Sequence, residues 1–171
     1  MTNSYYHSFL RLELRILSDF LANMKYATEH IKIRKAKSKD AGLLLKLYSK
    51  EKGVSDFAGL QTKERFLSLV NSKDAVIIVA EKEGKVIGAL DAEFYDESRF
   101  SYFANIVVSK KERGKGIASK LIKEYEQICK KRGIKTIVAL VFDWNKKMHP
   151  IMKNKKYKYT GNLREYIKKL R

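Results

Sequence analysis

Residues 105–119 read NIVVSKKERGKGIAS, and this stretch is the most informative part of the sequence. An apolar run rich in β-branched residues passes through a basic turn with two glycines directly into an amphipathic segment. Gly114 and Gly116 allow the backbone to turn tightly and to approach a ligand closely, because glycine has no Cβ. The first amides of the following helix have no acceptor within that helix, and the helix dipole adds positive potential there. The stretch therefore predicts a phosphate-binding turn.

Two widespread phosphate-binding motifs are excluded by the same residues. The chain contains no Gly-x-x-x-x-Gly-Lys-Ser/Thr, and the pattern Gly-x-Gly-x-x-Gly fails because position 119 is Ser. A glycine turn between a strand and a helix of an unrelated α/β domain remains the alternative interpretation.

The patterns on either side of this turn predict a mixed α/β sheet with helices on its faces. We expect strands at Ile31–Arg34, Ala75–Glu81, Lys85–Tyr95, Phe100–Val108, Lys135–Phe142, Tyr157–Tyr159 and Arg164–Leu170. We expect helices at 38–52 with Ser38 as cap, at 62–71, at 118–132 with Gly133 as stop, and at 145–154. Glu83-Gly84 is a hairpin signal, and Lys135–Phe142 is apolar on both faces, so it is expected to be buried.

The first 30 residues lie outside this order and form an N-terminal helical extension, followed by a single domain at 31–171. Residues 4–26 predict a helix whose seam has a heptad spacing, made by Leu10, Leu14, Leu17, Leu21 and Met24. Packing of this seam against its own domain and contact in a homodimer are both compatible with the pattern.

The composition limits the class of protein without naming an activity. Lys and Arg number 37 against 19 Asp and Glu, a formal charge of +18, which attracts polyanions such as nucleic acid or a phosphorylated cofactor. Cys129 is the single cysteine, so no internal disulfide is available, and we expect it to be buried in a helix. No run reaches the roughly 20 apolar residues of a membrane span, so we expect a cytoplasmic protein that is not inserted in a membrane.

The glycine turn resembles motif A of the GNAT superfamily of N-acetyltransferases, Arg/Gln-x-x-Gly-x-Gly/Ala, matched by Arg113-x-x-Gly116-x-Ala118. Val108, five residues before that arginine, also matches. The element order from Ile31 to Leu170 resembles the GNAT fold. The resemblance implies a mixed central sheet of six to seven strands flanked by about four helices, with the N-terminal helix as an addition.

The resemblance also implies where acetyl-CoA would bind. Ile106, Val107 and Val108 would meet its pantetheine arm at a splayed, bulged point in the sheet, with backbone groups of Ile106 and Val108 pairing with it. The Val108 N–H would serve as the oxyanion donor. Asn145 would contact the cofactor arm. The pyrophosphate would lie on the amides of the turn, which belong to Arg113, Gly114, Lys115, Gly116, Ile117, Ala118 and Ser119.

The general acid and base are less well defined. Met152 stands where many relatives have a proton-donating Tyr, and a thiol with a pKa near about 8.5 can leave without that acid. Tyr102 occupies the position where some relatives have a carboxylate base, and simple strand alternation puts it on one face with Ala104, Ile106 and Val108. It could contact substrate or only pack. Asp91 and Glu93 are weaker candidates that we expect on a solvated face.

These observations favour an acetyl-CoA-dependent N-acetyltransferase that acts on a primary amine, whether a protein N-terminus, a lysine or a small molecule. A non-catalytic acyl-CoA sensor and a basic nucleic-acid-binding module are the alternatives. We expect no metal, because the three histidines are scattered and one cysteine gives no metal-ligand spacing.

Overall fold

The computed structural model describes residues 11, 13–21, 31–51 and 61–161. The chain divides into two compact units, Met1–Ala139 and Leu140–Arg171. The expected boundary between an extension at 1–30 and a domain at 31–171 stays a prediction.

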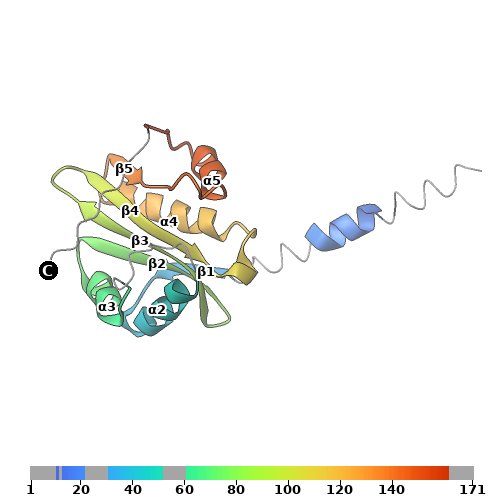
Figure 1. Cartoon of the computed structure of the whole chain (residues 1–171), viewed down its shortest axis with the longest axis horizontal. Helices are drawn as coiled ribbons and strands as arrows, with labels where there is room; N and C mark the ends of the chain where they lie inside the picture. The colour runs from blue at the N-terminus through green and yellow to red at the C-terminus, as the bar shows by residue number, and fades with distance from the viewer. Residues whose placement is uncertain (1–10, 12, 22–30, 52–60, 162–171) are drawn as a thin grey trace, which may run out of the picture. The chain divides into compact units, whose positions relative to one another are not determined.

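A mixed five-stranded sheet forms the centre of the first unit (Figure 1). Its strands follow the chain order, with antiparallel pairing from β1 to β4 and parallel pairing between β4 and β5. They are β1 (Ile31–Lys35), β2 (Ala75–Lys82), β3 (Lys85–Tyr95), β4 (Phe100–Val108) and β5 (Thr136–Ala139). The mixed α/β class is confirmed. The expected closing strand Arg164–Leu170 lies outside the described residues.

The turn between β2 and β3 is the one that the sequence indicated. Glu83 and Gly84 have φ angles of 49° and 74°, so both central residues are left-handed. A two-residue turn of this kind matches the twist of the strands that it joins, which explains why it closes the hairpin.

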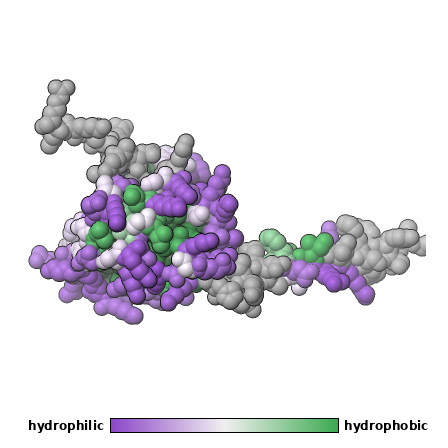
Figure 2. All heavy atoms as spheres, turned by 90° about the horizontal axis from the view of Figure 1, so that it is seen from below, coloured by the Kyte–Doolittle hydropathy of each residue, from purple (hydrophilic) through white to green (hydrophobic). Residues whose placement is uncertain are grey.

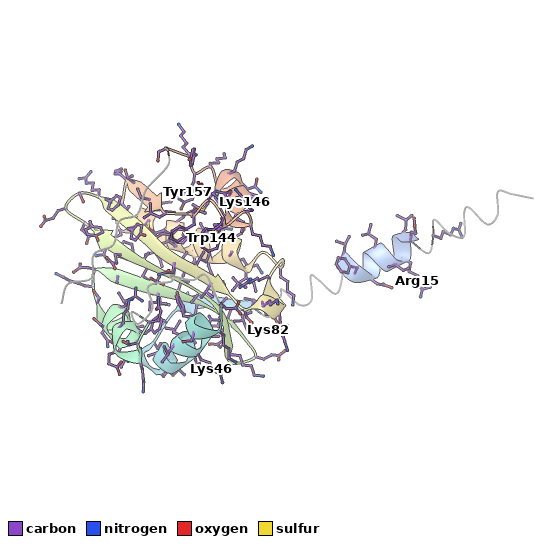
Figure 3. The ribbon with its side chains drawn as sticks, viewed as in Figure 1. Arg15, Lys46, Lys82, Trp144, Lys146 and Tyr157 are labelled. Carbon is purple, nitrogen blue, oxygen red and sulfur yellow. The ribbon has the colours of Figure 1, made fainter. Side chains whose placement is uncertain are left out.

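Helices cover both faces of the sheet. Helices α2 (Ala41–Lys50) and α3 (Lys63–Asn71) pack on one face, and α4 (Ile117–Lys131) packs on the other (Figure 1). The core between the sheet and α2–α3 contains Ala41, Leu44, Leu47, Tyr48, Phe66, Ile77, Val79, Ala89 and Val107. Basic side chains such as Lys46 on α2 point outward instead (Figure 3).

The helix ends agree with the expected signal at Gly133 and differ from it at Ser38. The Thr62 side chain caps α3 by accepting the Arg65 N–H at 3.1 Å. Gly133, with φ of 78°, ends α4 in a Schellman motif, since the Ile134 N–H donates to the Cys129 carbonyl at 3.0 Å.

The predicted cap at Ser38 was wrong. A 3₁₀ turn, Ser38–Asp40, precedes α2, and the Asp40 carboxylate accepts the Lys37 N–H at 2.7 Å. The Ser38 hydroxyl instead donates to the Asn71 side chain at 3.2 Å.

The strand predicted at Lys135–Phe142 is shorter and less buried than expected. β5 ends at Ala139, and Leu140 and Phe142 are half-exposed. In the second unit α5 (Met148–Asn154) forms near the expected place, with Pro150 in its first turn, where proline is tolerated. The expected strand Tyr157–Tyr159 is irregular chain.

Within the expected N-terminal helix, residues 11 and 13–21 are helical. The helix has an apolar and a polar side (Figure 2), and Leu14, Ile16, Leu17, Phe20 and Leu21 are all more than half exposed. In the described part of the chain, no helix combines the length and apolar character needed to cross a bilayer.

Candidate functional site

The turn between β4 and α4 leaves open space above two glycines. A 3₁₀ turn, Lys110–Glu112, leads into Gly114 and Gly116, which have φ angles of 81° and 72°. A Cβ built on either glycine would meet no atom within 4 Å. Gly116 is the N-cap of α4, so the cap has no side chain that could accept hydrogen bonds from the amides that follow it. These amides and the positive end of the helix dipole are therefore open to an anion.

Two basic side chains of the turn, Arg113 and Lys115, are paired within the protein, whereas Lys110 and Lys111 are exposed. Lys115 contacts the Glu112 carboxylate at 2.8 Å. Arg113 donates to the Glu51 carboxylate, and its Nε donates to the Val108 carbonyl at 2.9 Å. The backbone N–H groups of the turn therefore stand among four basic side chains, two of which are held by carboxylates of the protein.

The second half of β4 has an open edge beside the turn. β5 pairs only with Phe100–Phe103, so among the described residues no strand borders the rest of β4 on that side. The Ser109 N–H donates to the Ile87 carbonyl at 2.8 Å, next to the paired residues Gly88 and Val108. Because bonded pairs alternate along an antiparallel ladder, Ile106 and Val108 direct their N–H and C=O groups away from β3 and toward this open edge.

A β-bulge changes which side chains of β4 share a face. The register with β3 shifts between Asp91 and Ala92, which leaves residue 104 as the extra residue on β4. Before it, Ser101 and Phe103 contact Tyr125 of α4. After it, Val107 packs in the core with α2 and α3.

The expectation that Tyr102 shares a face with Ile106 and Val108 was therefore wrong. Tyr102 lies on the α2–α3 face with Asn105 and Val107, because the extra residue reverses the alternation. It pairs in register with Glu93 of β3 and Val138 of β5.

A buried carboxylate lies on that face beneath the bulge. Asp91, 2% exposed, accepts hydrogen bonds from the Tyr48 hydroxyl at 2.6 Å and from the Asn105 amide at 3.1 Å, and the Arg65 guanidinium lies 3.6 Å away. Burial raises the pKa of the Asp91 carboxyl above its usual range, although these donors oppose the rise. Burial also raises the pKa of Tyr48 well above its ordinary value, and the Asp91 charge adds to the rise.

The expectation of a solvated Asp91 was wrong. Sequence reasoning missed the roles of Tyr48 and Arg65, and the available signal was an aspartate in the middle of an otherwise apolar strand. Glu93 is half-buried and accepts the Tyr95 hydroxyl at 3.1 Å.

The remaining predicted residues belong to the second unit. Asn145 lies in a turn, where its N–H donates to the Phe142 carbonyl at 2.9 Å and its carbonyl accepts the Met148 N–H at 2.9 Å. Trp144, labelled in Figure 3, is 57% exposed and stacks on Phe142 at 5.4 Å. Met152 is buried in α5. The role of Asn145 toward a cofactor stays a prediction.

Among the described residues, no group of three or more His, Cys, Asp or Glu side chains is arranged to hold a metal ion. Cys129 is buried on α4, as expected, and burial raises its pKa. A buried thiol of this kind is a poor nucleophile.

Comparison with known proteins identifies a family and a shared fold. The model of the acetyltransferase (GNAT) family matches residues 43–154. Similar solved structures include an aminoglycoside acetyltransferase from an uncultured soil metagenomic sample in complex with sisomicin, with 18% identity, 84% of this chain and 99% of the other covered, and a TM-score of 0.69.

Two further structures have similar values. The PaiA N-acetyltransferase of Thermoplasma acidophilum in complex with coenzyme A has 18% identity, coverage of 73% and 87%, and a TM-score of 0.66. The ribosomal-protein-alanine N-acetyltransferase of Brucella melitensis has 16% identity, coverage of 82% and 99%, and a TM-score of 0.66. At these identities the likeness shows a shared fold.

Proposed function

This chain belongs to the GNAT acetyltransferase family, and from that premise we propose that it transfers an acetyl group from acetyl-CoA to a primary amine. The observation that carries the proposal is the pairing of an open glycine turn with an open strand edge. The turn offers unfilled space above Gly114 and Gly116, and the edge offers the backbone groups of Ile106 and the N–H of Val108, whose carbonyl already accepts a hydrogen bond from Arg113.

The two features suit two adjacent parts of acetyl-CoA. Its diphosphate would accept hydrogen bonds from the amides of Gly114, Lys115, Gly116, Ile117, Ala118 and Ser119, whereas the Arg113 N–H donates to the Lys110 carbonyl at 3.5 Å. Its pantetheine arm has amide groups of its own, which would pair with the free edge at Ile106–Val108 as an added strand does. A Cβ at Gly116 would occupy the space assigned to the phosphates, so the residues present fit the group.

Acetyl-CoA supplies the thioester, whose carbonyl carbon an unprotonated amine attacks. The Val108 N–H, which points to the open edge, would donate to the carbonyl oxygen as negative charge develops on it. Holding both reactants at one gap in the sheet supplies the proximity. The C–N bond forms, the C–S bond breaks as coenzyme A leaves as a thiolate that is protonated by solvent, and the amine proton is lost to solvent or to a base.

Tyr102 is the candidate to meet the acceptor, because its face carries the polar groups of Asp91 and Asn105. A neutral phenol is a poor base, so Tyr102 would position the amine or a water molecule instead of removing the proton itself.

The test is thiol release from acetyl-CoA in the presence of amines of different classes. The panel contains an aminoglycoside, a peptide with N-terminal alanine, a lysine peptide and a small diamine, of which the first two follow the described activities of structural neighbours. Thiol release with one class above the no-amine rate supports the enzyme and names its acceptor. Tight acetyl-CoA binding without thiol release from any amine would indicate a sensor, and no binding at all would refute both.

A further inference from the structure

The glycine turn is anchored by a residue that neither the motif nor the family resemblance includes. Glu51 directly follows α2, and its side chain is 12% exposed. Its Oε1 accepts the backbone N–H of Lys110 at 3.0 Å, and its Oε2 accepts the Arg113 guanidinium. One carboxylate thus contacts the beginning of the 3₁₀ turn and the residue directly after it.

Helix α2 itself gives no reason for an acidic residue at this place. Glu51 is the C-cap of α2, where the helix dipole and the last carbonyl groups are negative. A carboxylate there is unfavourable and a cation is preferred. The two donors from the turn offset this repulsion, so the contacts with Lys110 and Arg113 are the interactions that make Glu51 favourable.

Arg113 extends the same contact to β4. Its Nε donates to the carbonyl of Val108 at 2.9 Å, while its Nη2 donates to Glu51. The guanidinium thereby joins three segments: the end of α2, the last residue of β4 and the start of the glycine turn. Its Nε and Nη2 groups are thus both engaged within the protein, although the side chain is 44% exposed.

We propose that Glu51 is a positioning residue for the acetyl-CoA site, and that Arg113 acts through the Glu51 contact instead of binding the diphosphate directly. The pair holds the amides of residues 114–119 in the orientation that receives phosphate, and it holds the Val108 peptide beside them. This inference rests on the proposed function, because it assigns Glu51 to the same site.

Glu112 provides a matched control for Glu51. Both are partly buried carboxylates beside the turn, and each is paired with one of its cations, Glu112 with Lys115 at 2.8 Å. Removing either negative charge should favour a bound diphosphate if only long-range electrostatics matter. A loss of affinity on removing Glu51 therefore has the opposite sign from a simple charge effect.

The first measurement is calorimetric titration with coenzyme A. We expect Glu51→Ala to weaken binding by about tenfold, the scale of losing charge-assisted hydrogen bonds, and Glu51→Gln to lie between it and wild type. We expect Glu112→Gln to bind as wild type or slightly tighter. An unchanged or tighter Kd in Glu51→Ala would overturn the proposal.

A double variant distinguishes the two roles of Arg113. If Arg113 acts through Glu51, then Glu51→Ala combined with Arg113→Ala should weaken coenzyme A binding no more than the worse single change. Multiplied losses would mean that Arg113 contacts the diphosphate by itself, and the proposal would fail.

Amide hydrogen exchange of the ligand-free protein separates this inference from the proposed function. Glu51→Ala should speed exchange at residues 110–119, whereas Glu112→Gln should leave it near the wild-type rate. Unchanged exchange in Glu51→Ala would refute the anchoring even if coenzyme A binds. If wild-type protein fails to bind coenzyme A, the proposed function fails, while faster exchange would still support the anchoring of the turn.

Discussion

Replacing Gly116 by alanine should weaken coenzyme A binding far more than it destabilises the fold, and alanine at Gly133 provides the comparison. The two glycines flank the same helix, α4, with φ angles of 72° and 78°. A Cβ on either would meet no atom within 4 Å. The two changes therefore impose the same backbone strain without a steric clash, and only Gly116 lies in the candidate site.

The magnitudes follow from this geometry. A left-handed conformation costs an L-residue about 1–2 kcal/mol, so both variants should lose about that much free energy of unfolding. The Cβ at Gly116 would also stand where a phosphate oxygen approaches the first amides of α4. Loss of one hydrogen bond to a charged group costs about 1.5–3 kcal/mol, which corresponds to a rise in Kd of about 10–150-fold.

Urea denaturation gives the stability of each variant, and calorimetric titration with coenzyme A gives the affinity. Gly133→Ala should lose as much stability as Gly116→Ala but should bind coenzyme A with the wild-type Kd. If Gly116→Ala also binds coenzyme A with the wild-type Kd, the diphosphate does not lie on this turn, and the assignment of the site is refuted.

Three further changes test other parts of the structure. Gly88→Val should destabilise the fold by about 1–3 kcal/mol and weaken coenzyme A binding. The reason is that a Cβ on Gly88 would lie 3.2 Å from Cγ2 of Ile117, the first residue of α4. A Kd for coenzyme A equal to that of the wild type would show that the start of α4 can shift without loss of binding. Tyr102→Phe should lower kcat more than it changes the Kd for acetyl-CoA if the hydroxyl contacts the acceptor, and an unchanged kcat would leave Tyr102 a packing residue. The hydrogen bond from Arg34 holds the pKa of Asp40 below its ordinary value. The ionised carboxylate therefore contributes fully to the free energy of unfolding above about pH 4, and this contribution is lost as the pH falls through the lower folded pKa. Asp40→Asn should destabilise the protein at pH 7, and its difference in free energy of unfolding from the wild type should narrow in acid; a difference independent of pH would contradict this coupling.

Local patterns predicted the elements that carry the site. β-branched residues in a run, two glycines and an amphipathic segment specify a strand, a turn and a helix within fifteen residues, and the structure has β4, the turn and α4 there. The turn at Glu83-Gly84 and the helix end at Gly133 were also predictable, because a residue with a positive φ changes the direction of the backbone at its own position.

Local patterns failed where residues distant in the chain determine which face a side chain occupies or where a strand ends. Simple alternation put Tyr102 on the wrong face, because the bulge at residue 104 is set by pairing with β3 and leaves no mark in the sequence of β4. Lys135–Phe142 has the apolar pattern of a long buried strand, but β5 ends at Ala139, where its pairing with β4 stops.

The sequence by itself determined the family, the mixed α/β class and the turn that is available to a diphosphate, since each depends on residues within a few positions of one another. The tertiary structure alone decided which groups surround that turn. Glu51 and Arg113 are 62 residues apart, and Tyr48 and Asp91 are 43 apart. Such pairs form only when the sheet and its helices bring them together, because a carboxylate's partner is set by distance in space and not by spacing along the chain.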